Sequence, residues 1–214
     1  MTASTTGPMT ARVVDHRGAV RSWLLWTAGF LVFPVAGLLG TAAAGPVDSP
    51  VAAAVGGLVA GGALGIGQAL LSSRRLPALR WALATAIGMA TGLLLGAHAV
   101  GYGTTLGELA VMGALTGAVL GPAQALALPR PVRHRWLWAV PMPALWATGW
   151  AVSVLVVGDA VDAQFTLLGA SGALVISAVL GLLLHALIPP SGRTGPLPRS
   201  REIARASVTT GNPS

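Results

Sequence analysis

The sequence predicts an all-α fold, a polytopic membrane bundle of six transmembrane helices. Composition is the first reason: only 9% of the 214 residues are charged and 54% are hydrophobic, whereas soluble proteins carry about 25% charged residues. The mean hydropathy is +0.74. A surface so poor in charge faces lipid rather than water. The other two reasons are six long segments without charge and the placement of the arginines.

The six segments contain no Asp, Glu, Lys or Arg, and they are residues 22–47, 49–73, 81–107, 109–129, 136–158 and 163–192. Each reaches or exceeds the roughly 20 residues that a helix needs to cross a hydrocarbon core of about 30 Å. On this basis we expect spans at residues 22–43, 50–72, 80–101, 106–128, 135–157 and 163–188. The connections are short, so helices that follow one another should be antiparallel and adjacent.

The arginines account for the whole cationic charge and occupy alternate connections. All thirteen cationic residues are Arg, and the net charge is +7. They lie before the first span, between the second and third, between the fourth and fifth, and after the sixth. The remaining connections hold only acids, namely Asp48, Glu108, Asp159 and Asp162. This positive-inside pattern predicts that both termini are cytoplasmic in the cell (inner) membrane.

The same charge distribution predicts the partners of the chain. We expect the arginine clusters to contact anionic lipid headgroups. No nucleic-acid-binding module accompanies the positive charge, so nucleic acid is not an expected partner. The chain has no cysteine and four scattered histidines, which excludes thiolate chemistry and indicates neither a metal site nor a cofactor.

Two terminal tails should flank a transmembrane domain at residues 21–188. Residues 1–20 show no sustained periodicity, and residues 189–214 are rich in Pro, Ser, Gly and Arg. Such segments cannot build a core, so we expect both tails to be disordered and cytoplasmic. The first apolar segment runs for about 20 residues, longer than the roughly 7–15 of a signal peptide. We therefore interpret it as a retained helix.

Tryptophans support the expected helix starts. Five of them follow an arginine cluster at the start of an odd-numbered span, and they are Trp23, Trp26, Trp81, Trp136 and Trp138. Indole rings favour the headgroup level, which is where this position would place them. Trp146 and Trp150 fall deeper in the fifth span, where we expect them to pack or to face lipid.

An internal repeat is the most specific signal. The second span contains the string G-x3-G-x3-G-x2-Q-A-L, and the fourth span repeats it 56 residues later. Its glycines are Gly57, Gly61, Gly65, Gly113, Gly117 and Gly121. An arginine-bearing turn and a Trp-led helix follow each copy, Trp81 corresponding to Trp136. A degraded third copy contains Gly181 and His185. The pattern predicts three helical hairpins related by an axis along the membrane normal.

The glycines and the glutamine of each string share one helix face. At about 100° per residue, Gly57, Gly61 and Gly65 fall near 0°, 40° and 80°, and Gln68 falls near 20°. Small residues at this spacing let helix backbones approach closely in a membrane. We therefore expect the even-numbered helices to form a tightly packed inner layer.

Gln68, Gln124 and His185 occupy equivalent positions in the three copies. They form a candidate polar triad, which would be either hydrogen-bonded together or lining a small cytoplasmic vestibule. The alternative is that each side chain bonds a neighbouring backbone and only holds helices together.

The repeated unit of glycine-spaced helix, Q-x-L, arginine turn and Trp-led helix resembles a loose group of uncharacterised bacterial multipass membrane proteins. The resemblance covers residues 57–92 and 113–149 well. It implies a multipass membrane protein and implies no activity.

Two arrangements of polar residues in the sequence could carry chemistry. Gly169-Ala170-Ser171-Gly172 fits the G-x-S-G of rhomboid proteases. However, Ser171 and His185 would lie on one helix, about 21 Å apart along its axis, too far for a general base to act. We regard this match as coincidental. His98 and Glu108 could pair across a short loop, most simply as an interfacial polar pair.

The charge-free segments contain no Asp, Glu, Lys or Arg, the residues that coupled transport usually leaves inside a span. The sequence therefore favours a non-enzymatic multipass protein that acts as a packing or assembly component, with a membrane-protein partner or as a homo-oligomer. The alternative is a permease, or the membrane subunit of one, for a small neutral solute. A sealed centre would favour the first reading, and a polar cavity would favour the second.

Overall fold

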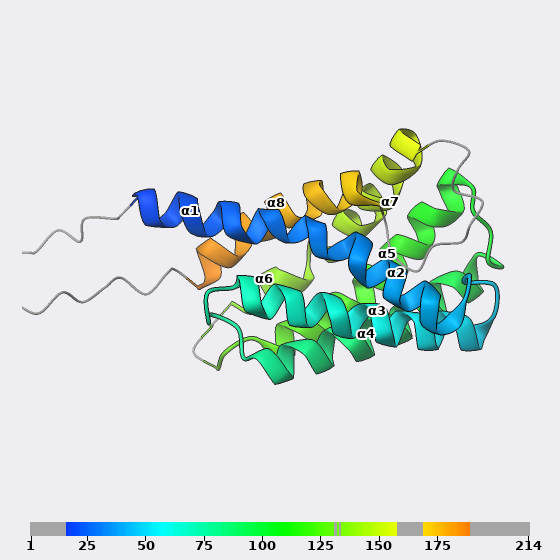
Figure 1. Ribbon diagram of the computed structural model, residues 1–214, viewed down its shortest axis with the longest axis horizontal. Coiled ribbons are helices and arrows are strands. Elements are labelled where there is room, and N and C mark those ends of the chain that lie inside the picture. Colours follow the sequence, from blue (N-terminus) through cyan, green and yellow to red (C-terminus); the bar gives the residue numbers. More distant parts are fainter. Residues whose placement is uncertain (1–15, 131, 133, 158–168, 189–214) are drawn as a thin grey trace, which may run out of the picture. The chain divides into compact units, whose positions relative to one another are not determined.

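A computed structural model describes residues 16–130, 132, 134–157 and 169–188 (Figure 1). All the regular secondary structure of these residues is helical. The helices are α1 (His16–Thr27), η1 (Ala28–Leu31), α2 (Val32–Ala44), α3 (Pro50–Leu71), α4 (Ala78–Ala99), α5 (Leu106–Ala127), α6 (Trp136–Ala139), α7 (Met142–Val157) and α8 (Ala170–Leu187). The all-α prediction is confirmed.

Six helical stretches in the described part are long and apolar enough to cross a membrane. They are Gly18–Ala44, Pro50–Leu71, Ala78–Ala99, Leu106–Ala127, Trp136–Val156 and Ala170–Leu187. The first helix begins at His16, so residues 16–20 belong to it and not to the expected tail. The expected start of the sixth span at residue 163 and the tail at 189–214 lie outside the described residues.

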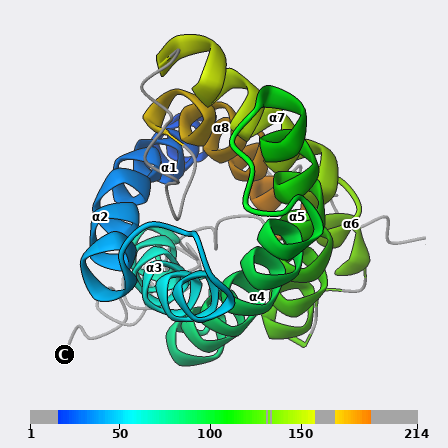
Figure 2. The same ribbon diagram turned by 90° about the vertical axis from the view of Figure 1, so that its right-hand side faces the viewer.

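The spans pack in chain order around a ring, which Figure 2 shows from one end. α3 packs between α2 and α4, α5 packs between α4 and α7, and α8 closes the ring against α7 and α1. In the described part, α3, α5 and α8 make no substantial contact with one another. The predicted inner layer of even-numbered helices is therefore wrong. Glycine-rich faces meet the next helix along the chain instead.

Two spans are interrupted where proline removes a backbone donor. In the first span the 3-10 segment η1 separates α1 from α2, and Pro34 follows four residues after Phe30. In the fifth span α6 ends before Pro141 and α7 begins at Met142. Proline lacks the N–H that an α-helix would use at these points. Pro122, by contrast, lies inside α5 without ending it.

The start of each central helix has a local cause. Ser49 precedes α3 in an extended conformation and accepts a hydrogen bond from the Ala52 N–H at 3.3 Å, with proline at the first helical position. Thr105 and Glu108 form a capping box at the start of α5. Both arrangements satisfy N–H groups that a helix end leaves unpaired.

Glycines bring α3 against α4 and α5 against α7. A Cβ on Gly61 would lie 2.6 Å from the Cβ of Met89 and 2.7 Å from the carbonyl oxygen of Thr85. A Cβ on Gly117 would overlap the carbonyl oxygen of Met142. Helix backbones can approach this closely only where no side chain intervenes.

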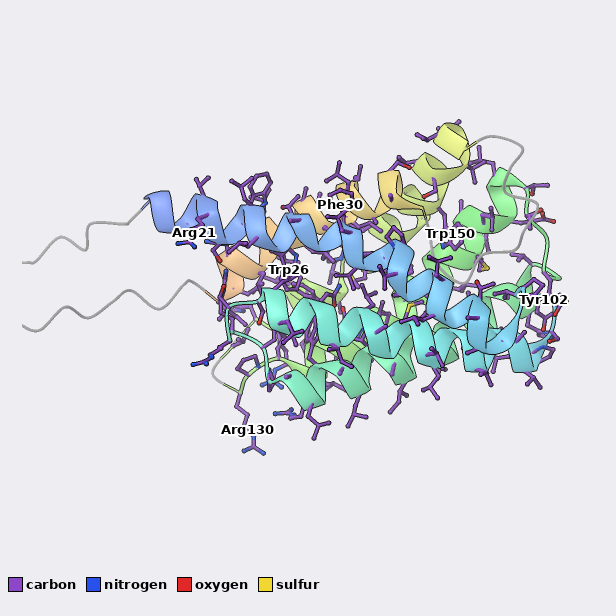
Figure 3. The ribbon with its side chains drawn as sticks, in the orientation of Figure 1. Arg21, Trp26, Phe30, Tyr102, Arg130 and Trp150 are labelled. Atoms are coloured by element: carbon purple, nitrogen blue, oxygen red, sulfur yellow. The ribbon has the colours of Figure 1, made fainter. Side chains whose placement is uncertain are left out.

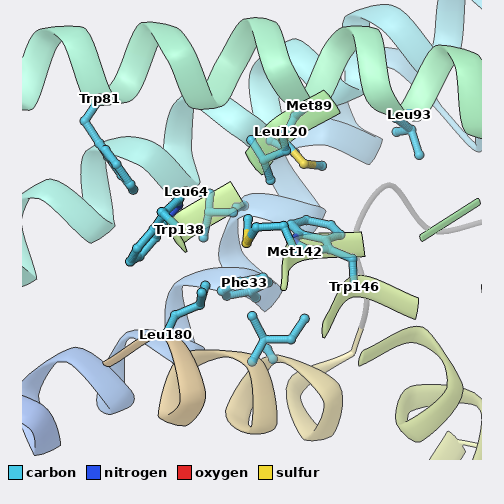
Figure 4. Close-up of a cluster of buried hydrophobic side chains, with 14 of the residues drawn as sticks. Phe33, Leu64, Trp81, Met89, Leu93, Leu120, Trp138, Met142, Trp146 and Leu180 are labelled. Carbon is cyan, nitrogen blue, oxygen red and sulfur yellow. The ribbon is translucent and has the colours of Figure 1, made fainter. Parts of the chain in front are cut away.

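Large side chains fill the interior of the ring. Trp81, Trp138 and Trp146 are among the largest fully buried side chains, and aliphatic residues and Met from the surrounding helices pack with them (Figure 4). The opposite helix faces carry exposed Leu, Val and Ile. The apolar residues thus divide between a packed interior and an outer face suited to lipid.

The arginine-bearing connections lie at one end of the described unit. Figure 3 labels Arg21 and Arg130 at this end and Tyr102 at the other. We call it the arginine end. It is also where α1 begins and α8 finishes (Figure 1).

Candidate functional site

Gln68 of α3 and Gln124 of α5 meet inside the ring near the arginine end. Both are buried, with exposed fractions of 8% and 1%. The Nε2 of Gln124 lies 3.5 Å from the Oε1 of Gln68 and donates to the Oγ1 of Thr85 at 3.0 Å. The structure thus brings two of the three predicted triad residues together. Thr85, on α4, lies between them as a partner that the sequence analysis did not identify.

Two buried tryptophans complete the site. The indole Nε1 of Trp81 donates to the Oε1 of Gln68, and that of Trp138 donates to the Oε1 of Gln124, each at 3.0 Å. The two rings meet edge to face with their centroids 5.4 Å apart. We call Gln68, Trp81, Thr85, Gln124 and Trp138 the Gln–Trp network.

The network continues through the hydroxyl of Thr85. Its Oγ1 donates to the carbonyl oxygen of Trp81 at 2.8 Å, one turn earlier on α4. The same Oγ1 accepts from Gln124. Each of the five side chains thus has at least one hydrogen-bond partner, as polar groups inside an apolar core require.

Three of the five tryptophans expected at the headgroups face the interior of the bundle instead of lipid. Trp26, Trp81 and Trp138 are 4%, 0% and 0% exposed and face the interior. Only Trp136 of the fifth span, 54% exposed, has the predicted outward position. Trp138, rather than Trp136, is therefore the structural counterpart of Trp81. The available signal was spacing, since Trp81 and Trp138 follow their glutamines by 13 and 14 residues.

His185 lies outside the network. No hydrogen bond within the described part joins it to Gln68 or Gln124, and its buried Nε2 has no hydrogen-bond partner there. Its helix faces α1 instead. A Cβ on Gly181 would lie 2.9 Å from the Cδ1 of both Trp23 and Trp26. The indole N–H of Trp23 donates to the carbonyl oxygen of Ala178 at 3.0 Å.

Arg75 joins three helices beside His185. Its Nε donates to the carbonyl oxygen of Ser72 at 3.1 Å, and its Nη1 donates to that of Ile188 at 3.3 Å. Its Nη2 donates to the hydroxyl of Ser22 on α1. Burial removes water from the guanidinium and lowers the pKa of Arg75.

The expected pairing of His98 with Glu108 is wrong. The Glu108 carboxylate accepts from the backbone N–H and the hydroxyl of Thr105, at 2.9 and 2.7 Å. The His98 ring lies edge to face with the ring of Tyr102, with centroids 6.4 Å apart. The Glu108 carboxylate caps α5 because Thr105 lies in the same helical turn, whereas His98 lies on the preceding helix.

The described residues offer little reactive chemistry. Ser171 and His185 both lie on α8, fourteen positions apart. No group of three or more His, Cys, Asp or Glu within the described ranges could hold a metal ion. The Gln–Trp network itself contains no acid, base or nucleophile that is active near neutral pH. Its evident capability is to join α3, α4, α5 and the fifth span.

The chain matches no protein-family model, no curated protein and no solved structure in the comparisons made.

Proposed function

We propose that this chain is a non-catalytic multipass protein of the bacterial cytoplasmic membrane that acts as a packing or assembly component. The six apolar helices support a location in a membrane. The observation that carries the proposal is the interior of the ring, where Trp81, Trp138 and Trp146 are 0%, 0% and 2% exposed. Side chains of this size occupy the path that a solute would need.

The Gln–Trp network supports the same proposal. A solute site would need polar groups that turn toward a ligand. The acceptor oxygens of Gln68 and Gln124 are instead taken by the indoles of Trp81 and Trp138. The outer faces, with exposed leucines such as Leu38, Leu70 and Leu79, remain available for lipid or for another membrane protein.

Three hairpin repeats are part of the proposal. Gly61 approaches the backbone of Thr85 and Ala86, and Gly117 approaches that of Met142 and Pro143. Gly117 lies 56 residues after Gly61, and its partners on α7 lie 57 residues after the partners of Gly61 on α4. Shifts that differ by one residue support a repeated unit with a single residue inserted in the second copy.

Flux measurements test the proposal against the permease alternative. The purified chain would be reconstituted in liposomes, and the permeation of glycerol and urea would be followed by stopped-flow light scattering. We expect rates equal to those of protein-free liposomes. Permeation faster than in protein-free liposomes would favour the permease if substitution of a residue in the interior of the ring slows it.

Native mass spectrometry provides the positive test. After mild extraction from the membranes of its own host, we expect the chain to run either with a membrane-protein partner in fixed stoichiometry or as a homo-oligomer. A monomer alone at every detergent concentration would contradict an assembly role.

The proposed orientation places both termini and the arginine end in the cytoplasm, next to anionic headgroups. The chain has no cysteine, so single cysteines can report on it without background. Cysteines replacing Asp48, Gly103 and Asp159 should label from outside intact cells, and those replacing Ser73 and His134 should not. Labelling of the second pair would overturn the orientation. Asp159 lies outside the described residues, so Asp48 and Gly103 carry the structural part of this test.

A further inference from the structure

Arg75 differs from its neighbours at the arginine end. Arg21, Arg74, Arg80 and Arg130 are exposed, whereas Arg75 is 9% exposed. The turn after α3 directs it inward, because Ser73 and Arg74 both adopt left-handed backbone conformations, with φ of 54° and 64°. The guanidinium therefore enters the junction of α1, α3 and α8, away from the water at the surface.

Neutral groups alone surround this cation in the described part of the chain. Its hydrogen bonds go to the carbonyl oxygens of Ser72 and Ile188 and to the hydroxyl of Ser22. A guanidinium has five N–H donors, so these three bonds leave two. The described residues supply no carboxylate to it, and desolvation alone shifts its pKa. A buried cation is costly unless an anion pairs with it.

His185 adds a second group in need of a partner. Its Nε2 is buried and has no hydrogen bond within the described ranges. It lies one turn before Ile188, the residue that Arg75 binds, and the charge of Arg75 acts on it electrostatically. A guanidinium with two N–H groups to spare and an imidazole nitrogen without a partner thus lie at one junction.

We propose that Arg75 and His185 form a binding site for a phosphate group, the phosphodiester of an anionic phospholipid headgroup. Phosphate oxygens match the N–H fork of arginine in spacing and charge. The junction lies at the arginine end, where positive-inside topology places headgroups. Free phosphate has the same chemistry and is the other source to be tested. The site requires only that the chain lies in a membrane, so it is independent of the assembly role.

A competing account assigns Arg75 a structural role alone. A cation near a helix C-terminus is favourable, and Arg75 bonds carbonyl oxygens at the ends of α3 and α8. In that case Arg75 would stabilise the fold equally in every lipid. The two accounts therefore differ in whether its contribution depends on phosphate.

The test measures thermal unfolding of the full chain in a neutral detergent. The additions are short-chain phosphatidylglycerol, short-chain phosphatidylcholine or inorganic phosphate. Arg75→Gln is compared with Arg74→Gln, a matched loss of one charge at the adjacent, exposed position. With the site near saturation, we expect phosphatidylglycerol to raise the midpoint of the wild type and of Arg74→Gln by about 5–10 °C. Arg75→Gln should lose most of this shift. Phosphatidylcholine should give a smaller shift, because its own choline cation competes with Arg75 for the phosphodiester.

Each outcome decides the proposal. An equal Arg75-dependent shift with inorganic phosphate would support the site and identify free phosphate as its source. Equal shifts in Arg75→Gln and Arg74→Gln, or no shift with any addition, would overturn it. Arg75→Gln could fail to fold, because it also removes bonds to three helices. His185→Leu then decides: loss of at least half the lipid-induced shift supports the site, and a full shift overturns it.

Discussion

The contacts of α3 with α4 and of α5 with α7 differ from the contact of α8 with α1, although glycine lies in all three. In the first two, glycines meet backbone, and a buried glutamine bonds a tryptophan of the next helix. In the third, Gly181 meets indole rings, and His185 stands where the others have glutamine. The third contact also joins the two ends of the ring.

The difference shows how one helix pattern serves two purposes. Gln68 and Gln124 accept hydrogen bonds from the indoles of Trp81 and Trp138, so the glutamines of the first two contacts are paired inside the bundle. The Nε1 of Trp146 on α7 has no hydrogen-bond partner in the described structure. Two residues hold the third contact. Trp23 of α1 donates to the carbonyl oxygen of Ala178 on α8, and Arg75 donates both to Ser22 of α1 and to Ile188 at the end of α8. The same contact leaves the Nε2 of His185 unmatched in the described structure. The equivalent polar position is therefore hydrogen-bonded in the first two contacts and lacks a partner where the ring closes.

The largest expected effect concerns glycine against backbone. Gly61→Ala should lower the free energy of unfolding by about 1–3 kcal/mol, because its Cβ would meet the backbone of α4. The control is Gly62→Ala, whose Cβ would lie 3.9 Å from Ala86 and which should be neutral or stabilising, since alanine favours helix more than glycine does. Thermal unfolding in detergent compares them.

Gly181→Ala sharpens the comparison, because its Cβ would meet the rings of Trp23 and Trp26 rather than backbone. Rings can shift, so we expect a smaller loss than at Gly61. Equal unfolding midpoints for Gly61→Ala, Gly62→Ala and Gly181→Ala would show that close glycine packing does not stabilise the contact of α3 with α4.

A smaller loss is expected within the Gln–Trp network. Gln124→Leu removes the acceptor of the Trp138 indole and the donor to Thr85. Interhelical hydrogen bonds in membranes are worth about 0.6 kcal/mol on average and reach about 1.7. We expect a loss near the upper value, because a buried N–H is left unpaired. Trp138→Phe should cost less in the Gln124→Leu background than in the wild type, and equal losses in the two backgrounds would show that the bond is unimportant.

Coupling between the two glutamines is the next effect in size. Because Gln124 donates to Gln68, the double variant Gln68→Leu/Gln124→Leu should depart from the sum of the single variants by about 0.5 kcal/mol or more. Additive losses would mean that each glutamine only holds its own helix pair. The free energies of unfolding of all four proteins complete the cycle.

The smallest effect is expected at His185. His185→Leu in neutral detergent without anionic lipid should change stability by no more than about 0.5 kcal/mol, since it removes a polar atom that lacks a partner. A loss as large as that of Gln124→Leu would show that the third contact depends on a polar bond as the first two do.

Much of the fold could be predicted because its signals are local. Six charge-free segments of membrane-spanning length corresponded to six helices. The face shared by Gly57, Gly61 and Gly65 follows from helix periodicity alone. The direction in which that face points does not, because all sides of such a helix are apolar. For this reason we expected an inner layer of even-numbered helices, whereas the helices form a ring.

The helices, their approximate limits and the polar residues within them could be predicted from the sequence, because length, charge and periodicity are properties of one continuous segment. The partners of these residues depend on how the helices pack. Trp81 and Trp138 turn inward because buried glutamine oxygens accept their indole hydrogens, a gain that exists only once two helices lie together. Glu108, by contrast, finds its partner locally. Its carboxylate accepts from Thr105, three residues away, and so does not pair with His98. The meeting of α8 with α1 depends on closure of the whole ring, which no local pattern contains.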